Sequence, residues 1–131
     1  MKTFRFVRNT AALVVPAAFA AILSTPAMAD GPQAISTAAT HAGMAASGSD
    51  IAGVRRHLHH VLNCLVGADG QGFDAAAGNP CSTAGAAIPQ TTDAAAKEKL
   101  QKAATQLRAA IANDNLDAAK KAAGDVQQLL K

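Results

Sequence analysis

Residues 51–66 read IAGVRRHLHHVLNCLV. Their apolar side chains recur at the spacing of a single helix face, which comprises Ile51, Val54, Leu58, Val61, Leu62 and Leu65. Asp50 stands just before the stretch, at a position where a carboxylate caps the free N–H groups of a helix. We therefore predict an amphipathic helix over residues 51–66, with its apolar face turned to a core.

The rest of the chain is also predicted to be helical. Alanine, the best intrinsic helix former, makes up about a quarter of residues 30–131, and alternating strand patterns are absent. Three further helices are expected at residues 33–47, 93–112 and 116–130. The first is expected to bury Ile35, Ala38, Ala39, Ala42 and Ala46. Short turns at 48–50 and 113–115 favour an all-α fold, an antiparallel four-helix bundle built from two helical hairpins. Residues 67–92, rich in Gly, Ala and Ser, are expected to form a long loop.

The first 29 residues have the pattern of a bacterial export signal. Lys2, Arg5 and Arg8 precede an apolar run at residues 11–23, and Ala27-Met28-Ala29 matches the small-x-small cleavage pattern. The apolar run of about 13 residues is shorter than the ~20 that a membrane-spanning helix needs. We therefore predict a cleaved signal peptide at 1–29, a bundle domain at 30–131, and a periplasmic or secreted location without a membrane partner.

The formal charge of +3 belongs to that predicted signal. Three of the 12 Lys and Arg residues lie in it and none of the nine Asp and Glu residues, so the remaining chain is formally neutral. Phe73 is the only aromatic residue beyond the signal. A nucleic-acid partner is excluded because the basic surface and the stacking platforms are both missing. The pairs Arg55-Arg56 and Lys120-Lys121 are interpreted as solvated faces.

The chain has two cysteines, Cys64 and Cys81. In an oxidising compartment such a pair favours a disulfide, which would stabilise a thin core. A reduced Cys64 would instead be a thiolate ligand for zinc or Cu(I).

All four histidines fall between residues 41 and 60. His57 and His60 share a face of the predicted helix 51–66, whereas His59 points away from it. If the preceding helix folds back through the turn at 48–50, His41 comes level with His57, and Met44 lies at the edge of the cluster. We predict a transition-metal site formed by His41, His57, His60 and Met44, with copper favoured over zinc or nickel.

This pattern resembles the small metal-binding protein family, whose members are periplasmic, His-rich four-helix bundles that bind divalent metals and are thought to buffer or scavenge them. The resemblance covers most of residues 35–130 and implies His41, His57 and His60 as ligands. Since residues 93–131 contain no histidine, one site is expected here rather than several.

Two other functions fit the sequence. The first is a disulfide-stabilised module that binds another periplasmic protein without a metal. The second is non-covalent haem binding through histidine, for which the chain offers few aromatic residues. No CxxCH, HExxH, GxSxG or P-loop motif is present. No acidic residue lies within six positions of residues 57–60, so the chain is expected to be a binder and not an enzyme.

Overall fold

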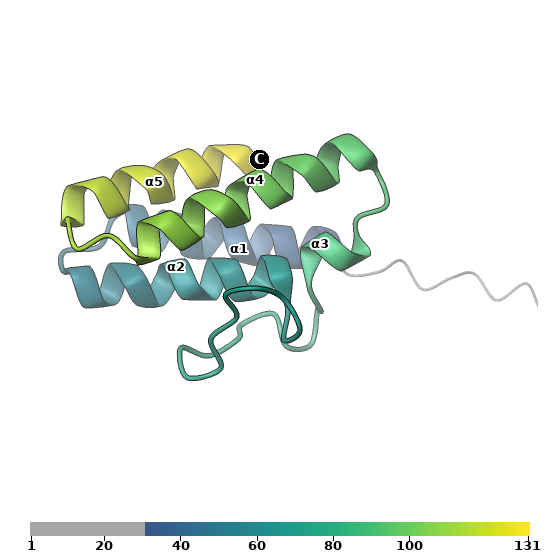
Figure 1. Cartoon of the computed structure of the whole chain (residues 1–131), viewed down its shortest axis with the longest axis horizontal. Helices are drawn as coiled ribbons and strands as arrows, with labels where there is room; N and C mark the ends of the chain where they lie inside the picture. Colours follow the sequence, from purple (N-terminus) through teal and green to yellow (C-terminus); the bar gives the residue numbers. More distant parts are fainter. Residues whose placement is uncertain (1–30) are drawn as a thin grey trace, which may run out of the picture.

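The structure, a computed structural model, describes residues 31–131 and contains helices but no strand over that range (Figure 1). The predicted signal at 1–29 lies outside the described residues. The helices are α1 (Gly31–Ala46), α2 (Ile51–Val66), α3 (Ala87–Gln90), α4 (Ala94–Ile111) and α5 (Leu116–Leu129). The all-α prediction is confirmed, and the bounds of the four long helices agree with the predicted ones to within about two residues.

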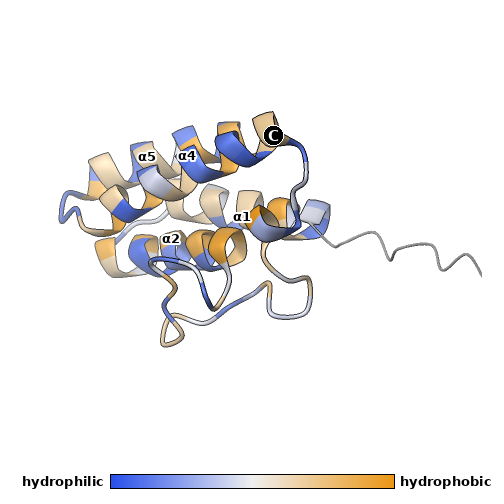
Figure 2. Cartoon of the chain, turned by 45° about the vertical axis from the view of Figure 1, so that its right-hand side comes forward, coloured by the Kyte–Doolittle hydropathy of each residue, from blue (hydrophilic) through white to orange (hydrophobic). Residues whose placement is uncertain are grey.

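The four long helices pack around a common core. α1 contacts α2 and α5, and α4 contacts the same two helices from the other side. Figure 2 shows hydrophobic and hydrophilic residues alternating around each long helix, as expected for helices with one buried face. Within residues 31–131, none of the helices combines the length and the apolar character needed to cross a bilayer.

The N-termini of α2, α4 and α5 are each capped by a side chain. The carboxylate of Asp50 accepts from the Gly53 N–H at 2.8 Å, and that of Asp93 accepts from the Ala96 N–H at 2.7 Å. The Asn115 side chain accepts from the backbone of α5 in the same way. Each contact satisfies an N–H that has no partner inside the helix, which explains why these helices begin where they do.

The core is uneven in composition. α2 contributes large side chains, of which Leu58, Leu62 and Leu65 are the largest. α1 contributes only small residues, namely Gly31, Ala34, Ala38, Ala42 and Ala45. The face predicted for α1 was therefore partly wrong. Ile35, Ala39 and Ala46 are only partly buried, because α1 is covered by α2 and α5 together and its buried strip follows both neighbours.

The loop predicted for residues 67–92 contains a helical turn. α3 contacts α1, α2 and α4 and buries Ala87. Pro89 does not prevent the turn because the first N–H groups of a helix need no internal partner. The remainder of the loop lies beside α2 (Figure 1), to which it is bound covalently by the Cys64–Cys81 disulfide.

Candidate metal centre

Three histidines meet between α1 and α2. His41 comes from α1, and His57 and His60 lie three residues apart on α2. Their ring centroids are 5.4 Å apart for His41 and His57, 4.7 Å for His41 and His60, and 5.6 Å for His57 and His60. We call these residues the His triad. The triad predicted from the helix spacing is thus brought together, and all three side chains are half-buried.

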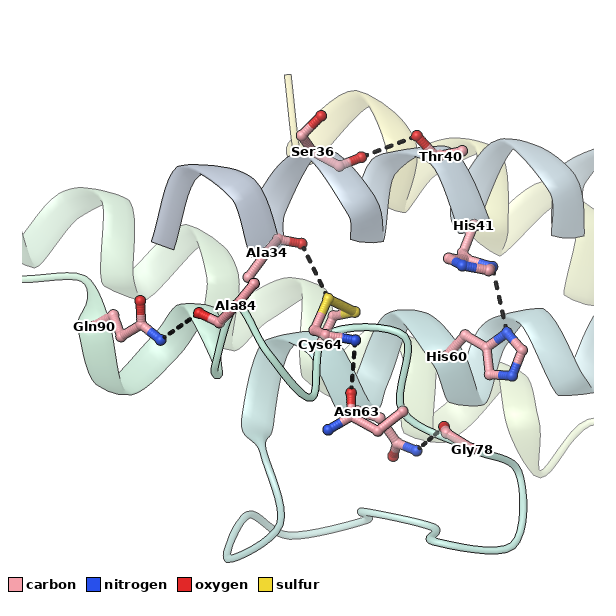
Figure 3. Close-up of a disulfide and its surroundings, with 12 residues drawn as sticks. Ala34, Ser36, Thr40, His41, His60, Asn63, Cys64, Gly78, Ala84 and Gln90 are labelled. Atoms are coloured by element: carbon pink, nitrogen blue, oxygen red, sulfur yellow. Dashed lines mark hydrogen bonds between the residues drawn. A yellow bond between two sulfur atoms is a disulfide. The ribbon is translucent and has the colours of Figure 1, made fainter. Parts of the chain in front are cut away.

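The same ring nitrogen of each histidine faces the centre of the triad. The Nδ1 atom of His41 lies 3.2 Å from Nδ1 of His57. It lies 3.3 Å from Nδ1 of His60, a contact shown in Figure 3. Two nitrogen lone pairs repel each other at such a distance. A proton or a metal cation must therefore lie between them.

The tautomer of His60 follows from its other nitrogen. Nε2 of His60 is 2.7 Å from the backbone oxygen of Ala77. A carbonyl oxygen only accepts hydrogen bonds, so Nε2 must carry the proton and donate it. With its proton on Nε2, an uncharged His60 ring has its free lone pair at Nδ1, the atom that faces His41.

The spacing of these nitrogens suits a metal ion. Zinc–nitrogen bonds are about 2.0–2.1 Å long, and tetrahedral angles then separate two nitrogen ligands by about 3.4 Å. The two Nδ1 separations of 3.2 and 3.3 Å are close to that value. One ligand atom from each of the three histidines lies within 4.8 Å of the others. The group provides three nitrogen donors, one fewer than a tetrahedral ion takes.

The surroundings of His41 and His57 favour uncharged imidazoles at these two positions. Burial lowers the pKa of His41 below its ordinary value, and repulsion from His60 and His57 lowers it further. Burial also lowers the pKa of His57, with smaller contributions from the charges of His60 and Arg56. Both shifts favour the neutral form, which is the form that can donate a lone pair to a metal.

Met44 lies one turn further along α1 and its side chain is 46% exposed. Among residues 31–131, Met44 is the one large hydrophobic residue whose side chain is exposed. Its predicted role as a metal ligand at the edge of the triad stays a prediction.

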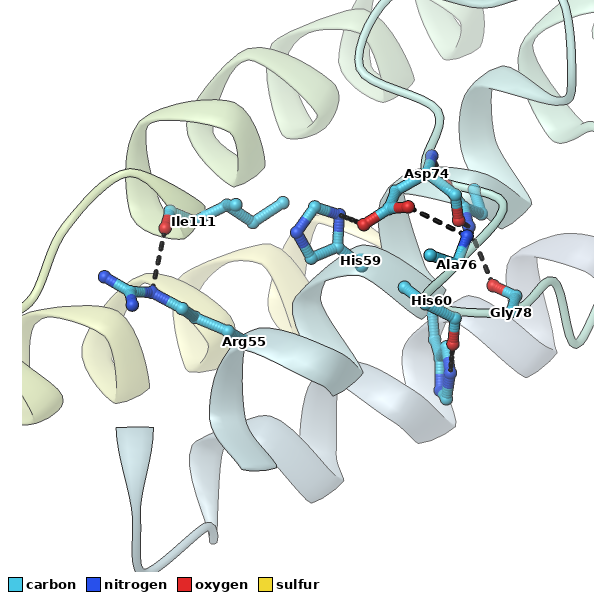
Figure 4. Close-up of polar contacts among 9 residues, drawn as sticks. Arg55, His59, His60, Asp74, Ala76, Gly78 and Ile111 are labelled. Carbon is cyan, nitrogen blue, oxygen red and sulfur yellow. Dashed lines mark hydrogen bonds and ion pairs between the residues drawn. The ribbon is translucent and has the colours of Figure 1, made fainter. Parts of the chain in front are cut away.

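His59 lies apart from the triad, as predicted, and its side chain is partly buried. Its Nδ1 atom is buried and faces the carboxylate of Asp74 at 3.8 Å, and 23% of its side chain is exposed (Figure 4). The absence of acidic residues near His59 in the sequence was misleading, because the loop after α2 folds back and brings Asp74 to it.

The predicted disulfide is present. The sulfur atoms of Cys64 and Cys81 are 2.01 Å apart, and the structure contains no free cysteine among residues 31–131. Cys64 therefore does not offer a thiolate in this state, and the alternative in which it is a metal ligand does not apply. The donors that the structure brings together are the three imidazoles.

Two side chains on α2 have contacts that the sequence did not reveal. Arg55 was interpreted as solvated, yet it donates a hydrogen bond to the backbone oxygen of Ile111 (Figure 4). It also donates to the backbone oxygen of Asn113 and pairs with Asp114, which connects α2 to the turn after α4. Asn63 is buried and bonds to the loop after α2. Asn63 could have been found in the sequence as a polar residue at a core position of α2. Its partners could not, because they depend on the path of the loop.

In comparisons with protein-family models, curated proteins and solved structures, the chain matches none, so the geometry of the His triad carries the functional interpretation.

Proposed function

We propose that this protein is exported and binds one transition-metal ion through His41, His57 and His60, acting as a buffer, scavenger or chaperone and not as a catalyst. In this proposal the long helices form an antiparallel four-helix bundle of two helical hairpins. The convergence of three Nδ1 atoms, with Nε2 of His60 turned to the backbone oxygen of Ala77, is the observation that supports the proposal most.

Copper is the proposed metal. Among divalent ions, Cu(II) binds nitrogen donors more tightly than nickel or zinc. Cu(I) is favoured by charge, because the three donors are neutral and Arg56 already contributes positive potential at His57. An ion of charge one is repelled less by that potential than an ion of charge two.

Calorimetric titration of the mature protein with Cu(I), Cu(II), Zn(II) and Ni(II) tests the proposal. Cu(I) is kept reduced with ascorbate, which leaves the disulfide intact. We expect one equivalent to bind, with copper the tightest. His41→Ala, His57→Ala and His60→Ala are each expected to abolish the tight phase.

His59→Ala is the matched control, because His59 belongs to the same helix but faces Asp74. It is expected to bind copper as tightly as the unsubstituted protein. The proposal fails if affinity is only millimolar, or if the three triad variants bind as well as the His59→Ala control.

A further inference from the structure

Asn63 holds both ends of a short loop segment against α2. The Nδ2 group of Asn63 donates to the backbone oxygens of Asp74 and Gly78, at 2.7 Å each. Its Oδ1 atom accepts from the Asp74 N–H at 3.0 Å. Both amide protons and the amide oxygen are therefore used, which compensates for a side chain that is only 1% exposed. We call residues 74–78 the Asn63-bound segment.

The Asn63-bound segment also contacts the His triad. It contains Ala77, whose carbonyl oxygen accepts the Nε2 proton of His60 at 2.7 Å. His60 and Asn63 are three residues apart on α2, so they lie on neighbouring positions of one helix face (Figure 3). The same face of α2 thus carries His60 and Asn63. The Asn63 amide binds the segment that contains Ala77, the hydrogen-bond acceptor of His60.

Within the segment, the backbone conformation is specific. Gly78 has a φ of +91°, in the region that L side chains rarely adopt. The Asp74 carboxylate accepts from the Ala76 N–H at 2.9 Å and supports the turn from inside. The position of the Ala77 carbonyl is therefore determined by contacts on both sides of it.

We propose that Asn63 is a positioning residue of the metal site. By holding the Asn63-bound segment, it places the Ala77 carbonyl so that the proton of His60 stays on Nε2 and the Nδ1 lone pair points to His41. This inference rests on the proposed metal binding. Hydrogen bonds of this kind orient histidine ligands, and their removal weakens metal binding by about ten- to a hundred-fold.

A purely structural role for Asn63 makes a different prediction. In that case, substitution lowers stability but leaves the tautomer of His60 unchanged. The tautomer can be read in the metal-free protein from long-range ¹H–¹⁵N NMR correlations of the imidazole ring. This readout does not depend on metal binding, so it separates failure of this inference from failure of the proposed function.

Two substitutions test the inference from different sides. Asn63→Asp keeps an acceptor but loses the NH₂ group, so the two hydrogen bonds to the Asp74 and Gly78 carbonyls can no longer both be donated. Gly78→Ala acts on the loop alone; its added Cβ would lie 3.7 Å from Nε2 of His60, an ordinary contact, so the effect comes from the backbone conformation. Gly78→Ala keeps the test informative if a buried carboxylate at position 63 prevents folding.

Gly72→Ala is the matched control. Gly72 has a φ of +87° in the same loop, and an added Cβ there would be more crowded, at 3.0 Å from the Leu62 side chain. Gly72→Ala is therefore expected to strain the loop at least as much as Gly78→Ala does, but at a position away from the Ala77 carbonyl.

We expect the unsubstituted protein and Gly72→Ala to show a single Nε2–H tautomer of His60. Asn63→Asp and Gly78→Ala are expected to show a mixture and to bind Cu(I) and Zn(II) about ten- to a hundred-fold more weakly. The inference is overturned if both variants keep the single tautomer, or if Gly72→Ala loses tautomer and affinity to the same extent.

Discussion

The loss of stability on removing the Cys64–Cys81 disulfide can be estimated from the length of the loop that it closes. The bridge joins residues 17 positions apart, and for a closed loop of that size the chain-entropy model gives about 3 kcal/mol of stabilisation at 25 °C. In a domain of about 100 residues, 1 kcal/mol changes Tm by about 4–8 °C, so loss of the bridge is expected to lower Tm by roughly 12–24 °C. The substitutions are Cys64→Ala and Cys81→Ala together, because serine would bury two hydroxyl groups.

The assay is thermal and urea unfolding of the double variant, followed by circular dichroism. Unsubstituted protein reduced with a dithiol is the control, since it loses the crosslink without losing side-chain volume. Both the double variant and the reduced protein are expected to show the Tm decrease of roughly 12–24 °C. A decrease of less than about 4 °C in both would refute the reasoning, because it would mean that the crosslink hardly restricts the unfolded chain.

Three further predictions concern stability. Leu58→Ala removes a fully buried side chain and is expected to lower the free energy of unfolding, measured by urea titration, by about 2–5 kcal/mol. A loss below about 1 kcal/mol would contradict the burial of Leu58 in the core. Asp50→Ala removes the cap of α2 and is expected to lower it by about 1 kcal/mol, whereas Asp50→Asn should retain most of the cap. The metal-free protein is expected to lose stability as the pH falls below about 6.5, because His41 and His57 have lowered pKa values in the folded state and the unfolded chain takes up protons first. Urea midpoints between pH 7.5 and 5 measure this slope, which should flatten when both histidines are replaced by asparagine.

The helices were predictable because their signals are local. Periodicity and capping residues located α2 at the residues where it is found, and the other three long helices to within about two residues. α3 was missed because a single turn containing Pro89 has no periodicity and forms through contacts with three other helices.

The triad was predictable because two local facts suffice for it. Helical spacing places His57 and His60 together, and a short turn folds α1 back onto α2. The partners of these residues were not predictable. The Ala77 carbonyl beside His60, the Asp74 carboxylate beside His59 and the hydrogen bonds of Asn63 all depend on the path of a loop that contains no repeating pattern.

The small-residue core face of α1, which is almost entirely alanine, bears on the metal binding proposed above. Alanine has no side-chain torsion that could rearrange to fill space, so α1 has little freedom to move toward or away from α2 without opening voids. The Cα atom of His41 is thereby held at a nearly constant separation from those of His57 and His60. If the His triad binds a metal as proposed, ions of different radius would have to be accommodated by rotation of the imidazole rings, and affinity would depend on ionic size.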